Sequence, residues 1–374
     1  MSNVKVISQA TIFRNGYRYA SHPHAALGAD GEIVVVFNQT RRNRFIFHPP
    51  HDPEYRNLVT RSDSLGQTWS PPQVAPSYDY SGMECASLTT LSSGRMLLNQ
   101  WKNRWYPLAL ARAGAPELVQ YPDEFVRELV VSGELDTGSQ ISGDPEDFAP
   151  WARGHGDAFV HVSEDHGRSF AVTTRIDTGQ FHGGYGLRGC VELPDGTLLL
   201  PLNDIPEFCT IFTVRSNDGG LSWRNPNLVA RRDGHLFTEA AMTLARDGSV
   251  LCMMRDDTTR IMHSCRSADQ GVSWSVAEAN GIDGYPPHLL TLPDGRILCT
   301  YGVRQPEFSI RAVLSDDNGR NWQSRDPLMI RRHLRNRDLG YPATLMLDDG
   351  SLFTVYYCQD ANGVTGIEFT RWRR

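Results

Sequence analysis

Arginine, carboxylate, tyrosine and histidine side chains recur at the edges of apolar, strand-like runs in this sequence. Arginine binds carboxylates through paired hydrogen bonds, whereas histidine, tyrosine and carboxylate groups can transfer protons or attack an electrophilic carbon. If the fold gathers these edges at one rim, they form a site for an anion or a sugar. The residues that begin or precede the runs are His22, His24, Glu84, Arg188, Glu239, Tyr285, His288 and Tyr341, and those that follow them are Arg41, Arg42, Arg255 and Arg304.

The apolar runs are arranged as six hairpins. Each reads as an apolar strand, a turn containing Asp-Gly or Ser-Gly, and a second apolar strand, which is a strong hairpin signal. The six are AALGADGEIVVVF, SLTTLSSGRMLLNQW, CVELPDGTLLLPL, AMTLARDGSVLCMM, LLTLPDGRILCTY and TLMLDDGSLFTVYY.

A second motif repeats in phase with the hairpins. It places Ser, Asp, Gly and an aromatic residue in a fixed frame, as in RSNDGGLSWR from Arg215, and it occurs five times with a period of about fifty residues. The first copy, RSDSLGQTWS, carries Ser64 where the others carry Asp165, Asp218, Asp269 and Asp317. We therefore predict an all-β fold, a six-bladed β-propeller of four-stranded antiparallel blades that occupies residues 1–374 as a single domain.

The order of strands in such a blade predicts where function lies. The hairpin turns and the repeated Ser/Asp/Gly/aromatic corners lie at one end of the propeller, so the long connecting loops and the pocket lie at the other end. The last hairpin is followed by only one strand, GIEFTRWRR, and the N-terminal run NVKVISQ is expected to complete that blade. Residues 102–156 form an insertion in blade two, with a short helix predicted at PDEFVRELVV; it forms a lid, a pocket wall or a surface decoration.

The repeated corners resemble the Asp-boxes of the sialidase (neuraminidase) superfamily, and the six hairpins extend the resemblance over nearly the whole chain. Members of that superfamily bind a substrate carboxylate with three arginines, use an aspartate as acid/base, and use a tyrosine paired with a glutamate as nucleophile. The segment FTEAAMTLARDGSVLCMMRD matches the one that carries the glutamate and an arginine, which implies Glu239 and Arg255. The segment DLGYPATLMLDDG implies Tyr341 as nucleophile, and the offset from Leu58-Val59 implies Asp52 as acid/base.

The other two arginines are less well defined. Arg304 matches the third arginine, with Arg311 as the competing choice. The Arg-Ile-Pro motif that normally opens the first strand is replaced by SHPH, so the first arginine is expected to be Arg18, or else Arg14. His22, His24, Glu84, Arg188 and His288 are further candidates for substrate binding.

Three functions remain open at this point. The first is a retaining exo-glycosidase that acts on a terminal acidic sugar. The second is a lyase that acts on a uronic acid with His22 or His24 and Tyr341 as base or acid. The third is a non-catalytic propeller that binds glycans, because Asp-box propellers serve several functions.

The composition of the chain limits the classes of partner that we expect it to bind. The net charge of −6 and the lack of a Lys/Arg run argue against nucleic acid as a partner, and no apolar segment is long enough to span a membrane. The N-terminus has no secretion signal, so we expect a cytoplasmic protein that takes an acidic sugar or oligosaccharide. The seven cysteines are expected to be reduced thiols, and no Cys/His spacing indicates a metal site, so neither a metal nor a cofactor is expected.

Overall fold

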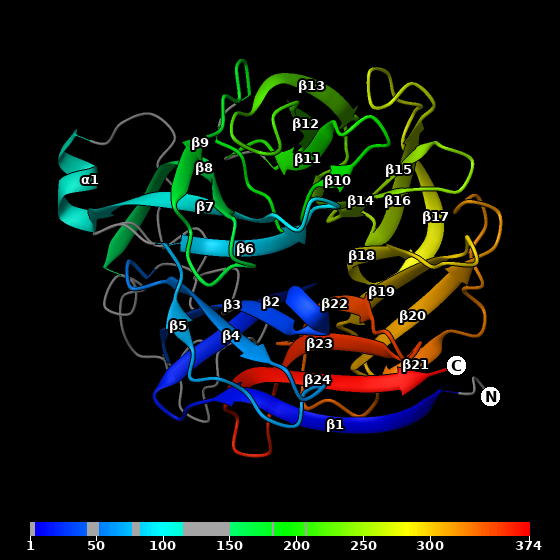
Figure 1. The fold of residues 1–374 in the computed structure, drawn as a ribbon. Coiled ribbons are helices and arrows are strands. Elements are labelled where there is room, and N and C mark those ends of the chain that lie inside the picture. Colours follow the sequence, from blue (N-terminus) through cyan, green and yellow to red (C-terminus); the bar gives the residue numbers. More distant parts are fainter. Residues whose placement is uncertain (1–3, 43–51, 77–82, 115–149, 182, 206–207) are drawn as a thin grey trace.

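The strands form six four-stranded sheets arranged around a central axis (Figure 1). The computed structural model describes residues 4–42, 52–76, 83–114, 150–181, 183–205 and 208–374. Neighbouring strands within each sheet pair antiparallel, and the first strand of each blade lies nearest the axis. The predicted fold class, a six-bladed propeller, is confirmed.

The strands follow the predicted order of hairpin, third strand, corner and fourth strand. The first three blades contain β2 (Arg18–Leu27), β3 (Ile33–Arg41), β4 (Arg56–Ser62) and β5 (Gln73–Val74), with a 3-10 turn η1 (Ala29–Gly31); β6 (Met83–Thr90), β7 (Met96–Pro107), β8 (Trp151–Ser163) and β9 (Val172–Arg175); and β10 (Val191–Glu192), β11 (Leu198–Asn203), β12 (Thr210–Ser216) and β13 (Arg224–Arg231). The last three contain β14 (Phe237–Leu244), β15 (Val250–Asp256), β16 (Ile261–Ser267) and β17 (Glu278–Asp283); β18 (Tyr285–Thr291), β19 (Ile297–Val303), β20 (Ser309–Ser315) and β21 (Leu328–Arg331); and β22 (Gly340–Met346), β23 (Leu352–Gln359) and β24 (Thr365–Arg373).

Blade six is completed by the N-terminal strand. β1 (Lys5–Arg14) pairs antiparallel with β24, and the sheet order is β1-β24-β23-β22. The start of β1 therefore lies beside the end of β24, with Lys5 opposite Arg373 (Figure 1). This pairing covers an edge that would otherwise expose unpaired backbone groups, as predicted.

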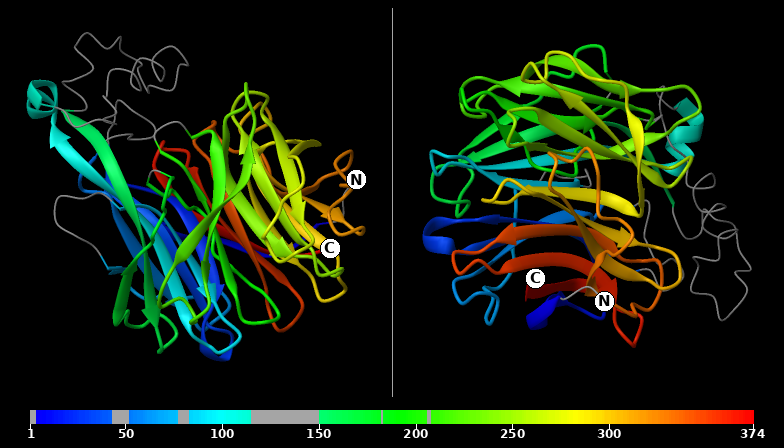
Figure 2. Two further views of the ribbon diagram at one scale, coloured as in Figure 1. Left: turned by 90° about the horizontal axis from the view of Figure 1, so that it is seen from above. Right: turned by 90° about the vertical axis from the view of Figure 1, so that its right-hand side faces the viewer.

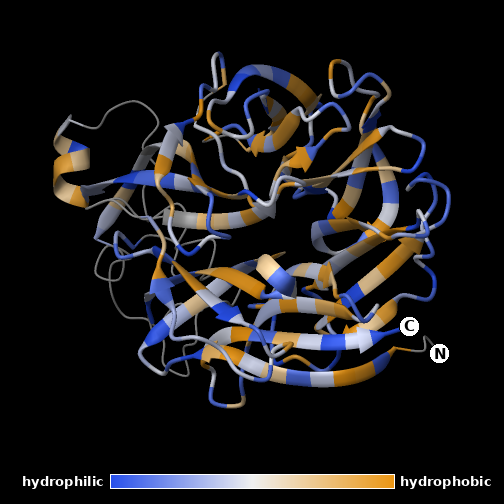
Figure 3. Cartoon of the chain, viewed as in Figure 1, coloured by the Kyte–Doolittle hydropathy of each residue, from blue (hydrophilic) through white to orange (hydrophobic). Residues whose placement is uncertain are grey.

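The core lies between the blades, and β3 explains why its sequence is a continuous apolar run. Val35 and Phe37 pack in one cluster with residues of blade six, whereas Val34 and Val36 pack in another with residues of blade two. Successive side chains of a strand point to opposite faces, so a sheet that is covered on both faces needs apolar residues at every position. Figure 3 shows hydrophobic residues gathered in the strands and hydrophilic ones in the connecting loops.

The repeated corners join the third and fourth strands, at the same end as the hairpin turns. Ile33, the first residue of β3 after the hairpin turn, pairs with Ser62, where the first corner begins. In the fifth corner the Ser315 hydroxyl donates to Asp317 at 2.7 Å and accepts from the Gly319 amide at 2.7 Å. The first corner keeps the Ser62 contact with the Gly66 amide, at 2.9 Å.

Part of the predicted insertion at 102–156 is an extension of the β7–β8 hairpin. β7 and β8 remain paired as far as Pro107 and Trp151, beyond Lys102, and the short helix α1 (Leu108–Gly114) follows β7. Figure 2 shows this hairpin and α1 projecting past the other blades. The helix predicted at 122–131 lies outside the described residues. No described helix has the length and hydropathy that a membrane span requires.

Candidate active site

The site is built on β-bulges in the first strands of the blades. The regular pairing shifts between Ser21 and His24 in β2, and at equivalent places in β6, β14, β18 and β22. A bulge redirects side chains from the sheet face, here toward the axis. The four non-glycine residues with left-handed backbone at these bulges are His22 (φ 49°), Cys85 (φ 52°), Glu239 (φ 52°) and Tyr341 (φ 48°). Such strained conformations persist where the surroundings hold them, often at functional sites.

Glu239 and Tyr341 meet through their side chains. The Tyr341 hydroxyl donates a short hydrogen bond to Oε1 of Glu239, and the Arg255 Nη1 group donates to Oε2 at 2.9 Å. Glu239 and Tyr341 are each only 5% exposed. Three residues that the sequence implies as partners, on three different strands, are therefore in direct contact.

The surroundings shift the pKa values of Glu239 and Tyr341 in opposite directions. Burial opposes ionisation of Glu239, but Arg255 and the Tyr341 hydroxyl outweigh it, and the pKa of Glu239 is lowered. Burial, and then the adjacent Glu239 carboxylate, raise the pKa of the Tyr341 phenol well above its usual value. At neutral pH a neutral phenol therefore donates to an ionised carboxylate, and this carboxylate is positioned to take the phenol proton.

Two arginines lie beside the pair. The guanidinium carbon of Arg255 is 4.2 Å from the centre of the Tyr285 ring, and that of Arg304 is 5.4 Å from the centre of the Tyr341 ring. Arg304 also donates to the Tyr357 hydroxyl at 3.1 Å. The competing candidate, Arg311, lies within β20 and donates to Ser309 at 2.9 Å. Of these two arginines, Arg304 is therefore the one that lies against Tyr341.

The two candidates for the first arginine differ in location. Arg14 lies on β1, the outermost strand of blade six, and forms an ion pair with Glu368 at 2.8 Å. Arg18 begins β2 on the axis, lies opposite Arg41 in the pairing with β3, and approaches Glu54 at 3.4 Å. Only Arg18 is on a strand that borders the site.

Asp52 is at the loop end of blade one. It is 8% exposed, its Oδ1 accepts the Glu54 amide at 2.8 Å, and its Oδ2 lies 3.6 Å from Nε of Arg41. The first of these contacts is a turn cap of the kind that Asp often makes. Within the described residues, no hydrogen bond or ion pair joins Asp52 to Glu239 or Tyr341, so its role stays a prediction.

The three candidate histidines lie at two different levels along the propeller axis. His22 meets Tyr341 edge to face, with ring centres 4.0 Å apart. His24 and His288 lie further along their strands, where they line a cavity together with Arg188. Glu84 is in β6, and its side chain is outside what the structure describes.

Several residues of the site carried no signal in the sequence. The Tyr185 hydroxyl donates to Glu239 at 3.4 Å, and the Asn203 side chain accepts the Glu239 amide at 2.7 Å. Asp257 accepts from Nε of Arg255, and burial raises the pKa of this carboxyl. Tyr357 falls in the apolar run LFTVYYC, which is typical of core. The Arg-Asp-Asp sequence around Asp257 is the one local feature that could have drawn attention to it.

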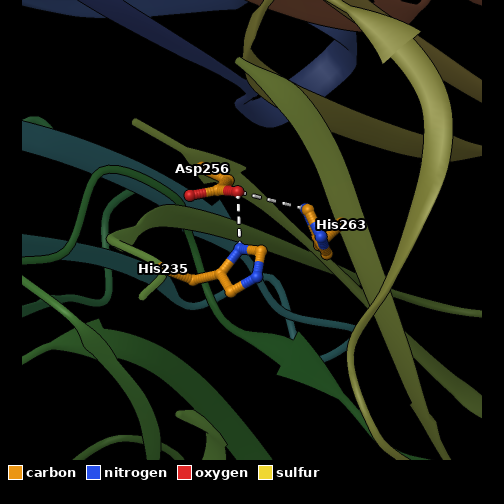
Figure 4. A group of neighbouring side chains, drawn as sticks. All are labelled: His235, Asp256 and His263. Carbon is orange, nitrogen blue, oxygen red and sulfur yellow. Dashed lines mark hydrogen bonds and ion pairs between the residues drawn. The ribbon is translucent and has the colours of Figure 1, made fainter. Parts of the chain in front are cut away.

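A separate cluster in blade four has the residue types of a metal site. Figure 4 shows His235, Asp256 and His263, with Oδ2 of Asp256 at 2.8 Å from Nδ1 of His235 and 3.7 Å from Nδ1 of His263. Asp256 also accepts hydrogen bonds from the Thr258 amide at 3.1 Å and the Thr259 hydroxyl at 2.6 Å. Because both carboxylate oxygens already have protein donors, the cluster is explained as an anchor for the loop after β15.

Comparison with known proteins agrees with this architecture. A family model described as BNR repeat-like domain matches residues 142–354. A search of curated proteins finds no match. A protein of unknown function from Dyadobacter fermentans has a similar structure (TM-score 0.81, 20% identity, 99% of each chain covered).

Two enzymes of known structure are also similar. One is the intramolecular trans-sialidase from Ruminococcus gnavus (TM-score 0.68, 13% identity, 100% of this chain and 97% of that chain). The other is an α-L-arabinanase from Penicillium chrysogenum (TM-score 0.64, 13% identity, 98% of each chain). At these identities the likeness establishes the fold, a sialidase-like propeller.

Proposed function

The chain belongs to the BNR repeat-like domain family, and on that premise we propose that it is a retaining exo-glycosidase that hydrolyses a terminal acidic sugar. The observation that carries the proposal is the Tyr341 hydroxyl bonded to the buried Glu239 carboxylate, which Arg255 holds from its other side. A tyrosine suits a sugar whose anomeric carbon bears a carboxylate, because a neutral phenol approaches that carbon without charge repulsion.

In the first step the Tyr341 oxygen attacks the anomeric carbon while the bond from that carbon to the leaving oxygen breaks. Glu239 accepts the phenol proton, and Asp52 donates a proton to the leaving oxygen. In the second step water attacks the same carbon and the bond to Tyr341 breaks. Asp52 takes the proton from water, and Glu239 returns its proton to Tyr341. Two inversions give net retention.

The substrate carboxylate is assigned to Arg255 and Arg304, with Arg18 approaching from blade one. Both Arg255 and Arg304 lie over the Tyr285 ring, and Arg304 also lies over the Tyr341 ring. Arg255 has Nη1 engaged by Glu239 and Nε by Asp257. Arg304 has Nη2 on Tyr357 and Nε on the Leu339 carbonyl.

The test is a pair of variants assayed on a panel of aryl glycosides of acidic sugars. Tyr341→Phe is expected to abolish turnover, whereas Tyr301→Phe, which alters a buried tyrosine of β19 outside the site, is expected to keep it. A fluorinated acidic glycosyl fluoride should add its sugar mass to the peptide that contains Tyr341. Near-full activity of Tyr341→Phe, or label on another residue, would overturn the nucleophile assignment.

A lyase is the second candidate, and the observation that favours it is the His22 ring against Tyr341. In a lyase, one of these residues would remove the proton beside a uronate carboxylate while arginine neutralises that carboxylate. Incubation with uronate oligosaccharides would then produce the ultraviolet absorbance of an unsaturated uronate, and His22→Ala would abolish it. Binding of the sugars without any product by mass spectrometry would support the non-catalytic alternative.

A further inference from the structure

A cavity lies on the propeller axis, on the hairpin-turn side of the bulges. Its volume is about 350 Å³, and its walls are the later parts of the first strands. Leu27, Thr90 and Met346, which end their strands beside the hairpin turns, belong to its lining. It is therefore displaced from Glu239 and Tyr341 toward the opposite end of the molecule.

Two histidines present N–H donors to this cavity. Nδ1 of His24 accepts the Leu88 amide at 3.2 Å, and Nδ1 of His288 accepts the Thr344 amide at 3.4 Å. A backbone amide can only donate, so each Nδ1 carries a lone pair and the proton of each neutral ring is on Nε2. Burial, and then Arg188, lower the pKa of His24 to about 3 and that of His288 well below its usual value. Among the described residues, neither Nε2 group has a hydrogen-bond partner, and the two ring centres are 5.5 Å apart.

Arg188 lines the same cavity and is not paired. It is 3% exposed, its Nε donates to the Pro287 carbonyl at 2.8 Å, and its Nη2 has no partner among the described residues. Glu239 attracts it at longer range, but that carboxylate is already bonded to Arg255 and Tyr341. A buried guanidinium without a paired anion is costly.

The lining contains donors without matching acceptors. Among the residues that the structure describes, no aspartate or glutamate lines the cavity, and its other walls include Leu88, Leu290 and Met346. A cation is disfavoured because Arg188, His24 and His288 all present N–H donors. The hydroxyls of Thr89 and Thr90 also line the cavity, and each already has a backbone partner. A sugar would find apolar walls opposite most of its hydroxyl groups.

We propose that this axial cavity binds one small inorganic anion, held by the Arg188 guanidinium and by the Nε2–H groups of His24 and His288. The anion neutralises the buried charge of Arg188 and accepts the hydrogen bonds that the protein leaves unmade. Chloride and phosphate share this chemistry. The proposal does not depend on the glycosidase activity, and it gives these three residues a ligand other than the substrate sugar.

The test begins with the wild-type protein. Crystals grown in sodium bromide should show an anomalous bromide peak within hydrogen-bonding distance of Arg188, His24 and His288, and crystals grown in sodium gluconate should not. Bromide, chloride and phosphate are then compared with gluconate by thermal denaturation at constant ionic strength. A larger stabilisation by phosphate identifies an oxyanion site, and a larger one by the halides identifies a halide site; either supports the proposal.

Variants connect the effect to the cavity. Arg188→Met is expected to weaken bromide binding by about tenfold or more, because a charge-assisted contact is lost. Leu290→Met, which changes an apolar wall residue, should keep the wild-type affinity. If Arg188→Met does not fold, His288→Leu takes its place. Absence of the bromide peak together with no stabilisation by phosphate beyond gluconate, or an equal response of Arg188→Met and wild type to the stabilising anion, would overturn the proposal.

Discussion

The corners between third and fourth strands and the bulges in the first strands both depend on left-handed backbone, yet they use it differently. The corners repeat one set of contacts: Ser216 and Asp218 in blade three are bonded as Ser315 and Asp317 are in blade five, at 2.7 Å. The bulges repeat a backbone shape but carry a different side chain in each blade: His22, Cys85, Glu239 and Tyr341. The repeated hydrogen bonds of the corners stabilise the fold. The bulges repeat one backbone conformation with different side chains, and these side chains together form the candidate site.

The bulges are also held by a recurring contact. Asn38 on β3 accepts the amide of Cys85 at 3.0 Å, and Asn203 on β11 accepts the amide of Glu239 at 2.7 Å. In both cases the second strand of one blade fixes the bulge of the next blade. The strained residue therefore depends on the neighbouring blade, whereas the bonds among the Ser, Asp and Gly of a corner are local.

The largest expected effect on kcat comes from replacing the carboxylate of Glu239, which lies at a bulge. Glu239→Gln is expected to lower kcat by about 10²–10⁴-fold, because the group that accepts the Tyr341 proton is lost. Glu368→Gln, at a buried ion-paired glutamate near the outer edge of blade six, should leave kcat unchanged. Steady-state kinetics of the two variants makes the comparison, and equal losses would contradict it.

Glu239 also predicts a dependence of stability on pH. Its pKa is lower in the folded protein than the usual value of 4.5. Its contribution to stability is therefore complete above about pH 4.5 and is lost as the pH falls through the folded pKa. In urea titrations, Glu239→Gln should reduce the loss of stability on acidification relative to wild type.

Removal of the Asn203 side chain, which accepts the bulge amide of Glu239, should have an intermediate effect on both stability and kcat. Asn203→Ala leaves the buried amide of Glu239 without its acceptor, which costs about 1–3 kcal/mol. The displaced carboxylate should also lower kcat between about 10- and 100-fold. Chemical denaturation and kinetics measure the two effects, and a stability loss without any loss of kcat would show that the bulge geometry is not needed for the reaction.

A corner substitution should affect stability alone. Asp317→Ala removes acceptors for Ser315 and for the Asn321 amide at 2.8 Å. The corner is partly exposed, so the expected cost is about 1 kcal/mol. The midpoint of thermal unfolding should fall while kcat and KM stay at wild-type values. A change in KM would indicate that the two ends of the propeller are coupled.

The smallest expected effect is a small gain in the stability of the folded protein. Ser64→Asp restores in the first corner the residue that the other four carry, beside Ser62 and Thr68, with which the Ser64 hydroxyl already interacts. Corrections of exposed turns of this kind stabilise a protein by up to about 1 kcal/mol. Thermal unfolding should show a slightly higher midpoint with unchanged activity, and a lower midpoint would contradict the equivalence of the five corners.

The fold was predictable because its signals are local and repeated. A turn such as Asp195-Gly196 between two apolar runs specifies a hairpin with few alternatives, and six hairpins in register with five corners leave little choice of architecture. The N-terminal strand was predictable for a related reason, since the last blade lacked one strand. The paired strands that begin and end the predicted insertion were not anticipated, because β7 continues beyond Lys102 without a change in local pattern.

The site was only partly accessible from sequence. Glu239, Arg255 and Tyr341 were named because they lie in segments that resemble known ones, and the structure brings them into contact. Tyr357 lies in an apolar run and Tyr185 in a glycine-rich stretch, and neither pattern shows whether the tyrosine hydroxyl meets solvent, an arginine or a carboxylate. Their positions at or before the starts of first strands suggested His24, Arg188 and His288 as substrate contacts, and the structure places all three on the wall of one cavity.

By itself, then, the sequence determined the number of blades, the order of their strands and the end of the propeller that carries the loops, since all of these follow from short-range patterns. The tertiary structure decided which side chains meet. Glu239 and Tyr341 are 102 residues apart and lie on different blades, and closure of the ring together with two bulges brings their oxygens into contact. The direction in which a bulge turns its side chain is set by hydrogen bonds from the neighbouring blade, such as that of Asn203, and no local pattern encodes such a contact.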